Sequence, residues 1–224
     1  MKNPETKLWF SFVVSFVPMA LALFLSAGRT SYWQAWVYLA VGVLTSAPLV
    51  LYIAKDPILL ENRTRIGPTV EQRPVQKIIV WCLTIPVVAM FIVPGLDHRF
   101  GWSNVPSWLT IAGDLLILLS MWMVYRVFKA NSFGSATVEV TKEQKVISTG
   151  PYALVRNPMY AGASIYFIGM SLALGSYWAL IPAALVTLGL VVRLFDEEKF
   201  LAQNLSGYTD YQKKVRHHLV PFVW

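Results

Sequence analysis

The residues best suited to binding a polar ligand gather in the last third of the chain. Residues 144–162 contain two backbone breaks, Gly150-Pro151 and Asn157-Pro158, which bracket an arginine, an asparagine and two tyrosines just before an apolar run. Irregular backbone at the edge of a membrane must be buried in protein or line a watery cavity. The segment is therefore either a site that presents polar groups to a ligand or a capped helix entrance with interfacial tyrosines. The residues alone favour neither.

A second polar cluster, residues 193–199, follows the last apolar run. Arg193 and Glu197 are four residues apart, so a helix would place them on one face. Glu197 could accept hydrogen bonds from an ammonium group or a ribose, and the planar fork of Arg193 could bind a carboxylate or a phosphate. The plain alternative, which composition favours, is a salt bridge at the helix exit worth about 0.3–0.5 kcal/mol if exposed.

Other chemistries find little support. His217 and His218 are adjacent and would point about 100° apart on a helix, which makes a poor metal pair. The single cysteine, Cys82, excludes a disulfide framework and a cysteine-based zinc site. Asp114 lies inside an apolar run, where we expect a hydrogen bond to a neighbour. No phosphate-binding glycine loop, zinc-binding helix motif or serine nucleophile elbow is present, and we predict no metal.

The elements that must position these clusters are membrane helices. The chain is 56% hydrophobic and 14% charged, against about 25% charged in soluble domains. Six apolar runs are long enough, or nearly so, to cross a bilayer: Leu8–Ala27, Tyr32–Ile53, Lys77–Leu96, Ser107–Phe128, Tyr160–Leu174 and Tyr177–Leu194. The last two are short and separated only by Gly175-Ser176, which predicts a tight hairpin. We therefore predict an all-α, polytopic membrane bundle of about six transmembrane helices, with the hairpin beside the site.

The basic residues define the orientation. Of the 19 lysines and arginines, only Arg29 and Arg99 lie on one side of this arrangement. The positive-inside rule then places both termini, the loop at residues 54–76 and both polar clusters in the cytoplasm. The net charge of +7 is spread over loops and forms no basic domain, so nucleic acid is not an expected partner. We divide the chain into four N-terminal spans, residues 1–128, and a catalytic region, residues 129–224.

The ordered set of motifs in the catalytic region is similar to that of the isoprenylcysteine carboxyl methyltransferase family. The wider relatives of that family include the phospholipid N-methyltransferases. The resemblance covers about residues 130–224, and residues 56–63 are similar to bacterial members. The motifs are Gly150-Pro-Tyr-x₃-Arg156-Asn-Pro-Met-Tyr160-x-Gly162, an apolar hairpin, Arg193-x₃-Glu197-Glu198-x₂-Leu201, Gly207-Tyr208-x₂-Tyr211 and Pro221.

The resemblance implies a cytoplasm-facing pocket for S-adenosyl-L-methionine, roofed by the C-terminal segment, in a bacterial inner membrane. A lipophilic acceptor would enter from the bilayer through a tunnel. Arg193 would be catalytic and bind the acceptor carboxylate, with Tyr160 also on the substrate side. The implied cofactor-binding residues are Gln144, Lys145, Val146, Ile147, Tyr152, Asn157, Pro158, Met159, Tyr160 and Glu197.

One position departs from the family pattern, which has Arg-His-Pro where this chain has Arg156-Asn157-Pro158. Asparagine donates and accepts hydrogen bonds but does not titrate. A carboxylate acceptor is already ionised at pH 7 and needs no base, so we expect Asn157 to act through hydrogen bonds. The expected reaction is direct in-line methyl transfer, promoted by positioning and desolvation.

Three alternatives stay open from the sequence. The acceptor could be a thiol or a phospholipid amine instead of a carboxylate. The chain could be an NADPH-dependent, sterol-reductase-like membrane enzyme, although Met159 and Ala163 replace residues typical of that pattern. It could also be a non-enzymatic transporter or membrane subunit, against which the one-sided polar clusters argue.

Overall fold

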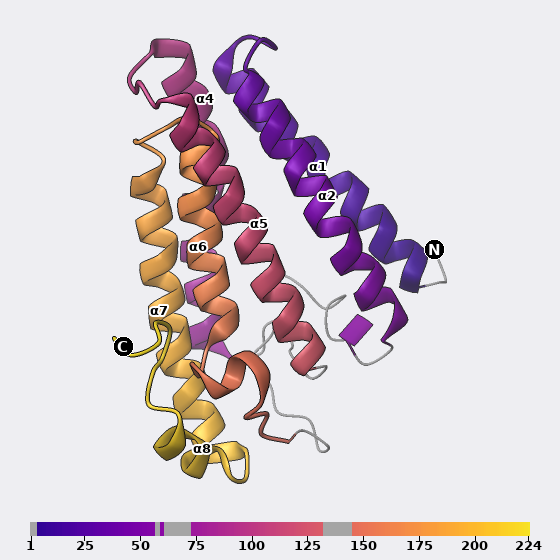
Figure 1. The fold of residues 1–224 in the computed structure, drawn as a ribbon, viewed down its shortest axis with the longest axis vertical. Helices are drawn as coiled ribbons and strands as arrows, with labels where there is room; N and C mark the ends of the chain where they lie inside the picture. Colours follow the sequence, from indigo (N-terminus) through magenta and orange to yellow (C-terminus); the bar gives the residue numbers. More distant parts are fainter. Residues whose placement is uncertain (1–3, 57–58, 61–72, 132–144) are drawn as a thin grey trace.

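The computed structural model describes residues 4–56, 59–60, 73–131 and 145–224, and these residues form a bundle of helices with no strand among them (Figure 1). Gln144 and most of the loop at residues 54–76 lie outside the described residues. Four helices carry stretches long and apolar enough to cross a membrane: α1 (Pro4–Ala27), α2 (Trp33–Lys55), α4 (Pro74–Phe100) and α5 (Ser107–Ala130). An integral membrane protein built from helices is thereby confirmed.

Three further helices and one turn follow α5. They are a 3-10 turn, η1 (Gly150–Ala153), then α6 (Pro158–Ala173), α7 (Leu180–Asn204) and α8 (Tyr208–Lys214). With 16 residues, α6 is shorter than the roughly 20 that cross a bilayer. The apolar part of α7 ends at Arg193. The predicted count of six spans therefore stays a prediction.

Helix α7 is longer than the sequence predicts. The predicted apolar run ends at Leu194, and the plain alternative places the second polar cluster at the helix exit, but α7 continues through the cluster to Asn204. The extension is stabilised by packing, because Leu201 and Ala202 lie against the buried side chains of Leu205 and Tyr208. The cluster thus lies on a continuous helix, which holds its side chains in fixed directions.

Helices α5 and α6 approach each other at two glycines. A Cβ atom on Gly113 would lie 2.3 Å from the backbone nitrogen of Ala173, and one on Gly169 would lie 2.9 Å from the carbonyl oxygen of Gly113. Small residues allow membrane helices to pack backbone against backbone in this way. The position of α6, which carries part of the candidate site, is therefore set by α5.

At the end of the bundle opposite the polar clusters, a buried carboxylate joins three segments. Asp97, which is 1% exposed, accepts hydrogen bonds from the backbone N–H of Ser103 at 2.7 Å and from the hydroxyls of Ser103 and Ser176. The Tyr32 phenol donates to the carbonyl of Leu174 nearby. These bonds tie the α4–α5 and α6–α7 connections to the start of α2, and so fix one end of the bundle.

The expectation for Asp114 is wrong for one of its oxygens. The side chain is buried on α5, and its Oδ1 has no hydrogen-bond partner among the described residues. The buried hydroxyl of Thr110, one turn earlier, likewise has no hydrogen-bond partner among the described residues. Both residues lie near Gly113, on the segment of α5 that packs closely against α6.

Candidate functional site

The candidate site lies at the lower end of the bundle in Figure 1, where α6 begins and the second half of α7, η1 and the C-terminal segment come together. Helix α6 and the turn η1 each begin at a residue that interrupts regular backbone structure. Pro158 occupies the first turn of α6, where its missing N–H costs nothing, and Asn157 precedes it. Gly150, with a φ of 60°, opens η1 in a conformation that glycine adopts readily.

A tyrosine hydroxyl joins α6 to α7. The Tyr160 phenol accepts a hydrogen bond from Nε of Arg193 at 3.1 Å and donates one to Oε2 of Glu197 at 2.6 Å. Arg193 and Glu197 share a face of α7, as predicted, but the ion pairs found among the described residues do not include one between them. The phenol lies between the two charges and fixes the orientation of each.

The neighbouring glutamate, Glu198, lies in a different environment. It is 5% exposed and receives the Nε and Nη2 groups of Arg156 at 2.9 and 3.0 Å. The amide nitrogen of Asn157 donates to Glu198 Oε1 at 2.6 Å. Because successive helical residues point about 100° apart, Glu197 faces Tyr160 while Glu198 faces the segment before α6. Asn157 thus has a partner that the sequence did not suggest.

Residues 215–224, which we call the C-terminal strap, lie against the same segment. The backbone N–H groups of Arg156 and Asn157 donate to the carbonyls of His217 and His218 at 2.9 and 3.0 Å. Nη1 of Arg156 donates to the carbonyls of Val215 and Arg216, and Nδ1 of His218 lies 3.1 Å from Glu198 Oε1. Arg156 therefore holds the strap and Glu198 together.

Tyrosines line the other side of this region. The Tyr211 phenol donates to the carbonyl of Tyr152 at 2.8 Å, and the Asn131 amide donates to the Tyr152 phenol at 3.1 Å. Burial raises the pKa of Tyr211 and of Tyr208 far above the usual value near 10, and the nearby Glu198 raises both further. Both phenols therefore stay neutral hydrogen-bond donors at physiological pH.

The structure connects most of the predicted cofactor residues. Tyr152 packs into one apolar cluster with Met159 and into a second with Val146. Asn157 reaches Glu198, next to Glu197, which in turn holds Tyr160. Pro158 is buried, Ile147 is partly buried and Lys145 is exposed. Their roles toward a ligand remain predictions.

Several side chains of the site region had no assigned role from the sequence, among them Arg73, Arg156, Asp196, Glu198 and His218. Nη2 of Arg73 donates to Asp196 Oδ1 at 3.0 Å, and the guanidinium lies 4.6 Å from the ring centre of Phe200. This pair fixes the start of α4 to α7. The sequence contains a signal for these contacts: the consecutive acids Asp196, Glu197 and Glu198 point in three directions on a helix, and each needs its own partner.

The side chains gathered at the candidate site fit S-adenosyl-L-methionine in their chemistry. This cofactor carries a sulfonium and an ammonium group, which carboxylates and aromatic faces bind. Glu197, Tyr160 and Tyr152 offer these groups within one part of the molecule. In the described part of the chain, no group of three or more histidines, cysteines or acids is arranged to hold a metal ion.

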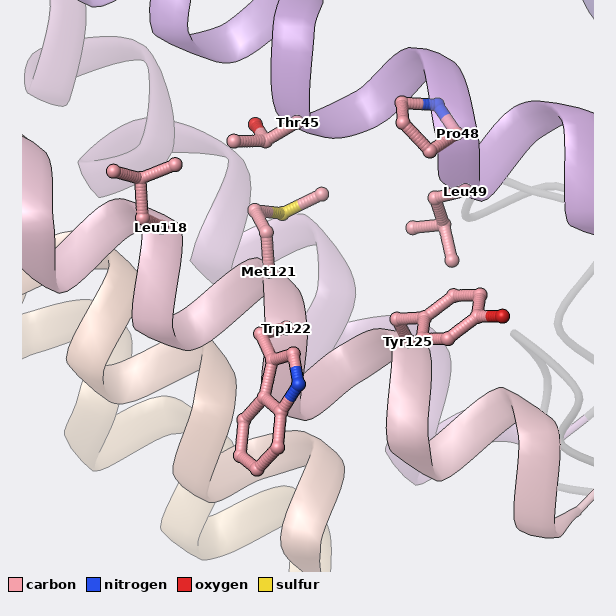
Figure 2. A pocket seen from close by; sticks show the side chains of 7 residues that line it. All are labelled: Thr45, Pro48, Leu49, Leu118, Met121, Trp122 and Tyr125. Carbon is pink, nitrogen blue, oxygen red and sulfur yellow. The ribbon is translucent and has the colours of Figure 1, made fainter.

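A groove of about 210 Å³ lies between α2 and α5 (Figure 2). It is lined by Thr45, Pro48, Leu49, Leu118, Met121, Trp122 and Tyr125. Tyr125 makes an edge-on contact with Tyr52, with ring centres 5.3 Å apart. Tyr52 and Leu49 pack against the same apolar cluster as Tyr152 and Met159. The groove therefore adjoins the apolar cluster against which the candidate-site residues Tyr152 and Met159 pack.

Residues 108–207 match the family model described as phospholipid methyltransferase. The match begins in α5, earlier than the motifs quoted from the sequence, and ends at Gly207, before the strap. It confirms the resemblance to membrane methyltransferases over this region. A comparison with curated proteins gives no match.

Proposed function

We propose that this membrane methyltransferase transfers the methyl group of S-adenosyl-L-methionine to a lipophilic carboxylate at the cytoplasmic face of the bilayer. The observation that carries the proposal is the chain Arg193–Tyr160–Glu197, which holds a cation and an anion at fixed positions on one helix face. A cationic cofactor suits the anion, and an anionic acceptor suits the cation.

Each residue then has a definite task. Glu197 accepts hydrogen bonds from the polar end of the cofactor, whose sulfonium supplies the electrophilic methyl group. Tyr160 accepts from Nε of Arg193, which fixes the plane of the guanidinium toward the acceptor. The acceptor carboxylate is ionised at neutral pH, so no residue need remove a proton. Holding the two reactants in line, away from water, lowers the barrier.

The groove between α2 and α5 supports a lipophilic acceptor. Its lining is largely apolar, and it lies on the halves of α2 and α5 nearer the candidate site. A hydrocarbon chain could lie there while its polar end reaches the site. Partition of such a chain from water into the bilayer contributes about 0.8 kcal/mol per methylene, so lipophilic acceptors are concentrated beside the groove and soluble ones are not.

The membrane placement completes the proposal. In this proposal α6 and the apolar part of α7, which pack against α5 and α4, cross the bilayer as a hairpin and bring the number of spans to six. The N-terminus, the strap and the site are cytoplasmic, because the opposite end carries only Arg29 and Arg99 among the lysines and arginines.

A second acceptor, a phospholipid amine, is favoured by the family match itself. Its phosphate would take the place of the carboxylate beside Arg193, since an arginine fork binds either group.

One experiment separates the two. The purified protein is incubated with S-adenosyl-L-methionine tritiated in its methyl group and, in turn, a prenylated cysteine, a long-chain fatty acid and phosphatidylethanolamine vesicles. Alkali releases volatile labelled methanol from a methyl ester but leaves an N-methyl amine or a thioether intact. Alkali-labile label on a lipophilic acid supports the first proposal, and stable label on phosphatidylethanolamine supports the second.

Calorimetric titration with S-adenosylhomocysteine and with NADPH provides the independent check on the cofactor. We expect binding of the first alone. Binding of NADPH alone, or of neither ligand, would contradict the proposed cofactor.

A further inference from the structure

The chain ends in a short apolar turn that the methyl-transfer reaction does not use. Phe222 and Val223 are 87% and 78% exposed, and Val220 and Trp224 are also exposed. The turn is nevertheless ordered, because the N–H groups of Leu219 and Val220 donate to the Trp224 carbonyl and the Trp224 N–H donates back to Val220. Phe222 adopts a φ of 63°, which is unfavourable for a residue with a side chain. The strap thus presents adjacent apolar side chains outward.

These side chains continue an apolar stripe on α7. The exposed large apolar residues of that helix recur every three or four positions and so lie on one face: Ile181, Leu185, Leu188, Val192 and Phe195. The last of them, Phe195, packs edge-on against Trp224 with ring centres 5.8 Å apart. The apolar surface of α7 therefore passes without a break onto the strap.

The position of the strap matches the edge of a bilayer. In Figure 1 the C-terminus lies beside α7, well above α8 and about level with the lower end of α5, a candidate span. Exposed basic side chains of α8 and the strap lie close by in the chain, namely Lys213, Lys214 and Arg216. Apolar and aromatic groups flanked by cations are typical of segments that bind the anionic cytoplasmic leaflet.

We propose that residues 220–224 insert into the cytoplasmic interface of the bilayer, with Phe222, Val223 and Trp224 at the boundary between headgroups and acyl chains. The partner is an anionic lipid surface. Insertion holds the strap in place, and through Arg156 it steadies the segment that begins α6. The inference rests on the proposed placement of α7 in the membrane, but not on the reaction.

The test places a nitroxide label at the strap and at a matched site in water. In a Cys82→Ser background, Val223→Cys and, as a control, Thr209→Cys on α8 are labelled and reconstituted into vesicles of phosphatidylcholine and phosphatidylglycerol. We expect the label at position 223 to collide several-fold more often with oxygen than with a water-soluble nickel chelate, and the label at position 209 to show the reverse. Equal access of the chelate to both labels would overturn the proposal.

A second measurement uses the chain with Cys82 unchanged. The double variant Phe222→Ser/Val223→Ser replaces two exposed side chains, so the fold should persist. Carboxypeptidase should then digest its C-terminus several-fold faster than that of the unchanged chain in the same vesicles, and equal rates would contradict insertion. Neither measurement involves S-adenosylhomocysteine binding, so a failure here is distinguishable from a failure of the proposed function.

Discussion

At the scale of single residues, Glu197 and Glu198 are chemically identical, but their positions on α7 give them different partners. Glu198 is enclosed by Arg156, Asn157 and His218, which satisfy its carboxylate within the protein. Glu197 faces Tyr160 on the adjoining side of α7. The first holds the strap and the segment before α6 together, and the second shares the Tyr160 phenol with Arg193.

Replacing Glu197 with glutamine should therefore weaken cofactor binding and leave the fold intact. A hydrogen bond to a charged group contributes about 1.5–3 kcal/mol, so the affinity for S-adenosylhomocysteine should fall about tenfold or more, measured by calorimetric titration. Unchanged affinity would remove Glu197 from the cofactor site.

The matched variant, Glu198→Gln, should act mainly on stability. It leaves the charge of Arg156, whose side chain is 8% exposed, without its partner. Breaking a buried ion pair in this way costs about 3–5 kcal/mol. Thermal unfolding in detergent should show the loss, and an unfolding temperature equal to that of the unchanged chain would contradict the assignment.

Arg193→Ala tests the acceptor side. Cofactor affinity should stay within about twofold while methylation of an anionic acceptor falls by at least tenfold, because a charge-assisted bidentate contact is lost. Arg99→Ala, which removes an exposed arginine at the opposite end of the bundle, is the control and should have little effect on transfer. Normal turnover by Arg193→Ala would remove the main reason for a carboxylate acceptor.

At the scale of elements, the site depends on how closely α6 lies against α5. The two glycines at their contact leave no room for a side chain, and the atoms that a Cβ would meet are backbone at Gly113 and backbone plus the Cβ of Leu116 at Gly169. Neighbouring backbone in a helix cannot move aside cheaply, so a larger residue must push the helices apart.

Gly113→Ala should therefore destabilise the bundle by about 1–3 kcal/mol, the usual cost of overpacking. Gly42→Ala is the control, because a Cβ there meets only the ring of Phe16 at 3.2 Å, and a side chain can rotate away. Thermal unfolding of both variants in the same detergent checks this, and equal unfolding temperatures would show that the helices separate easily.

At the scale of the whole molecule, the asymmetry of charge predicts one orientation. In a Cys82→Ser background, Thr30→Cys lies at the end with Arg29 and Arg99, and Asp210→Cys lies on α8 at the other end. A membrane-impermeant maleimide added to intact cells should label the first and spare the second until the cells are opened. The opposite pattern would invert the topology.

Much of the fold follows from the sequence, because a lipid environment requires long apolar helices and their composition identifies them. The four long helices appear within a few residues of the predicted runs. The motifs around Arg156, Tyr160 and Glu197 likewise indicate where the polar region lies, since backbone breaks and charges beside apolar runs are conspicuous in one dimension.

Only the tertiary structure decided which of these groups meet. The sequence could not show that a phenol lies between Arg193 and Glu197, that Asn157 bonds to Glu198, or that the strap lies on Arg156. Those contacts join residues up to 62 positions apart, and they depend on the directions in which α7 presents its acids and on the close approach of α5 and α6. Composition determines that the chain enters the membrane, whereas packing determines which polar groups become partners there.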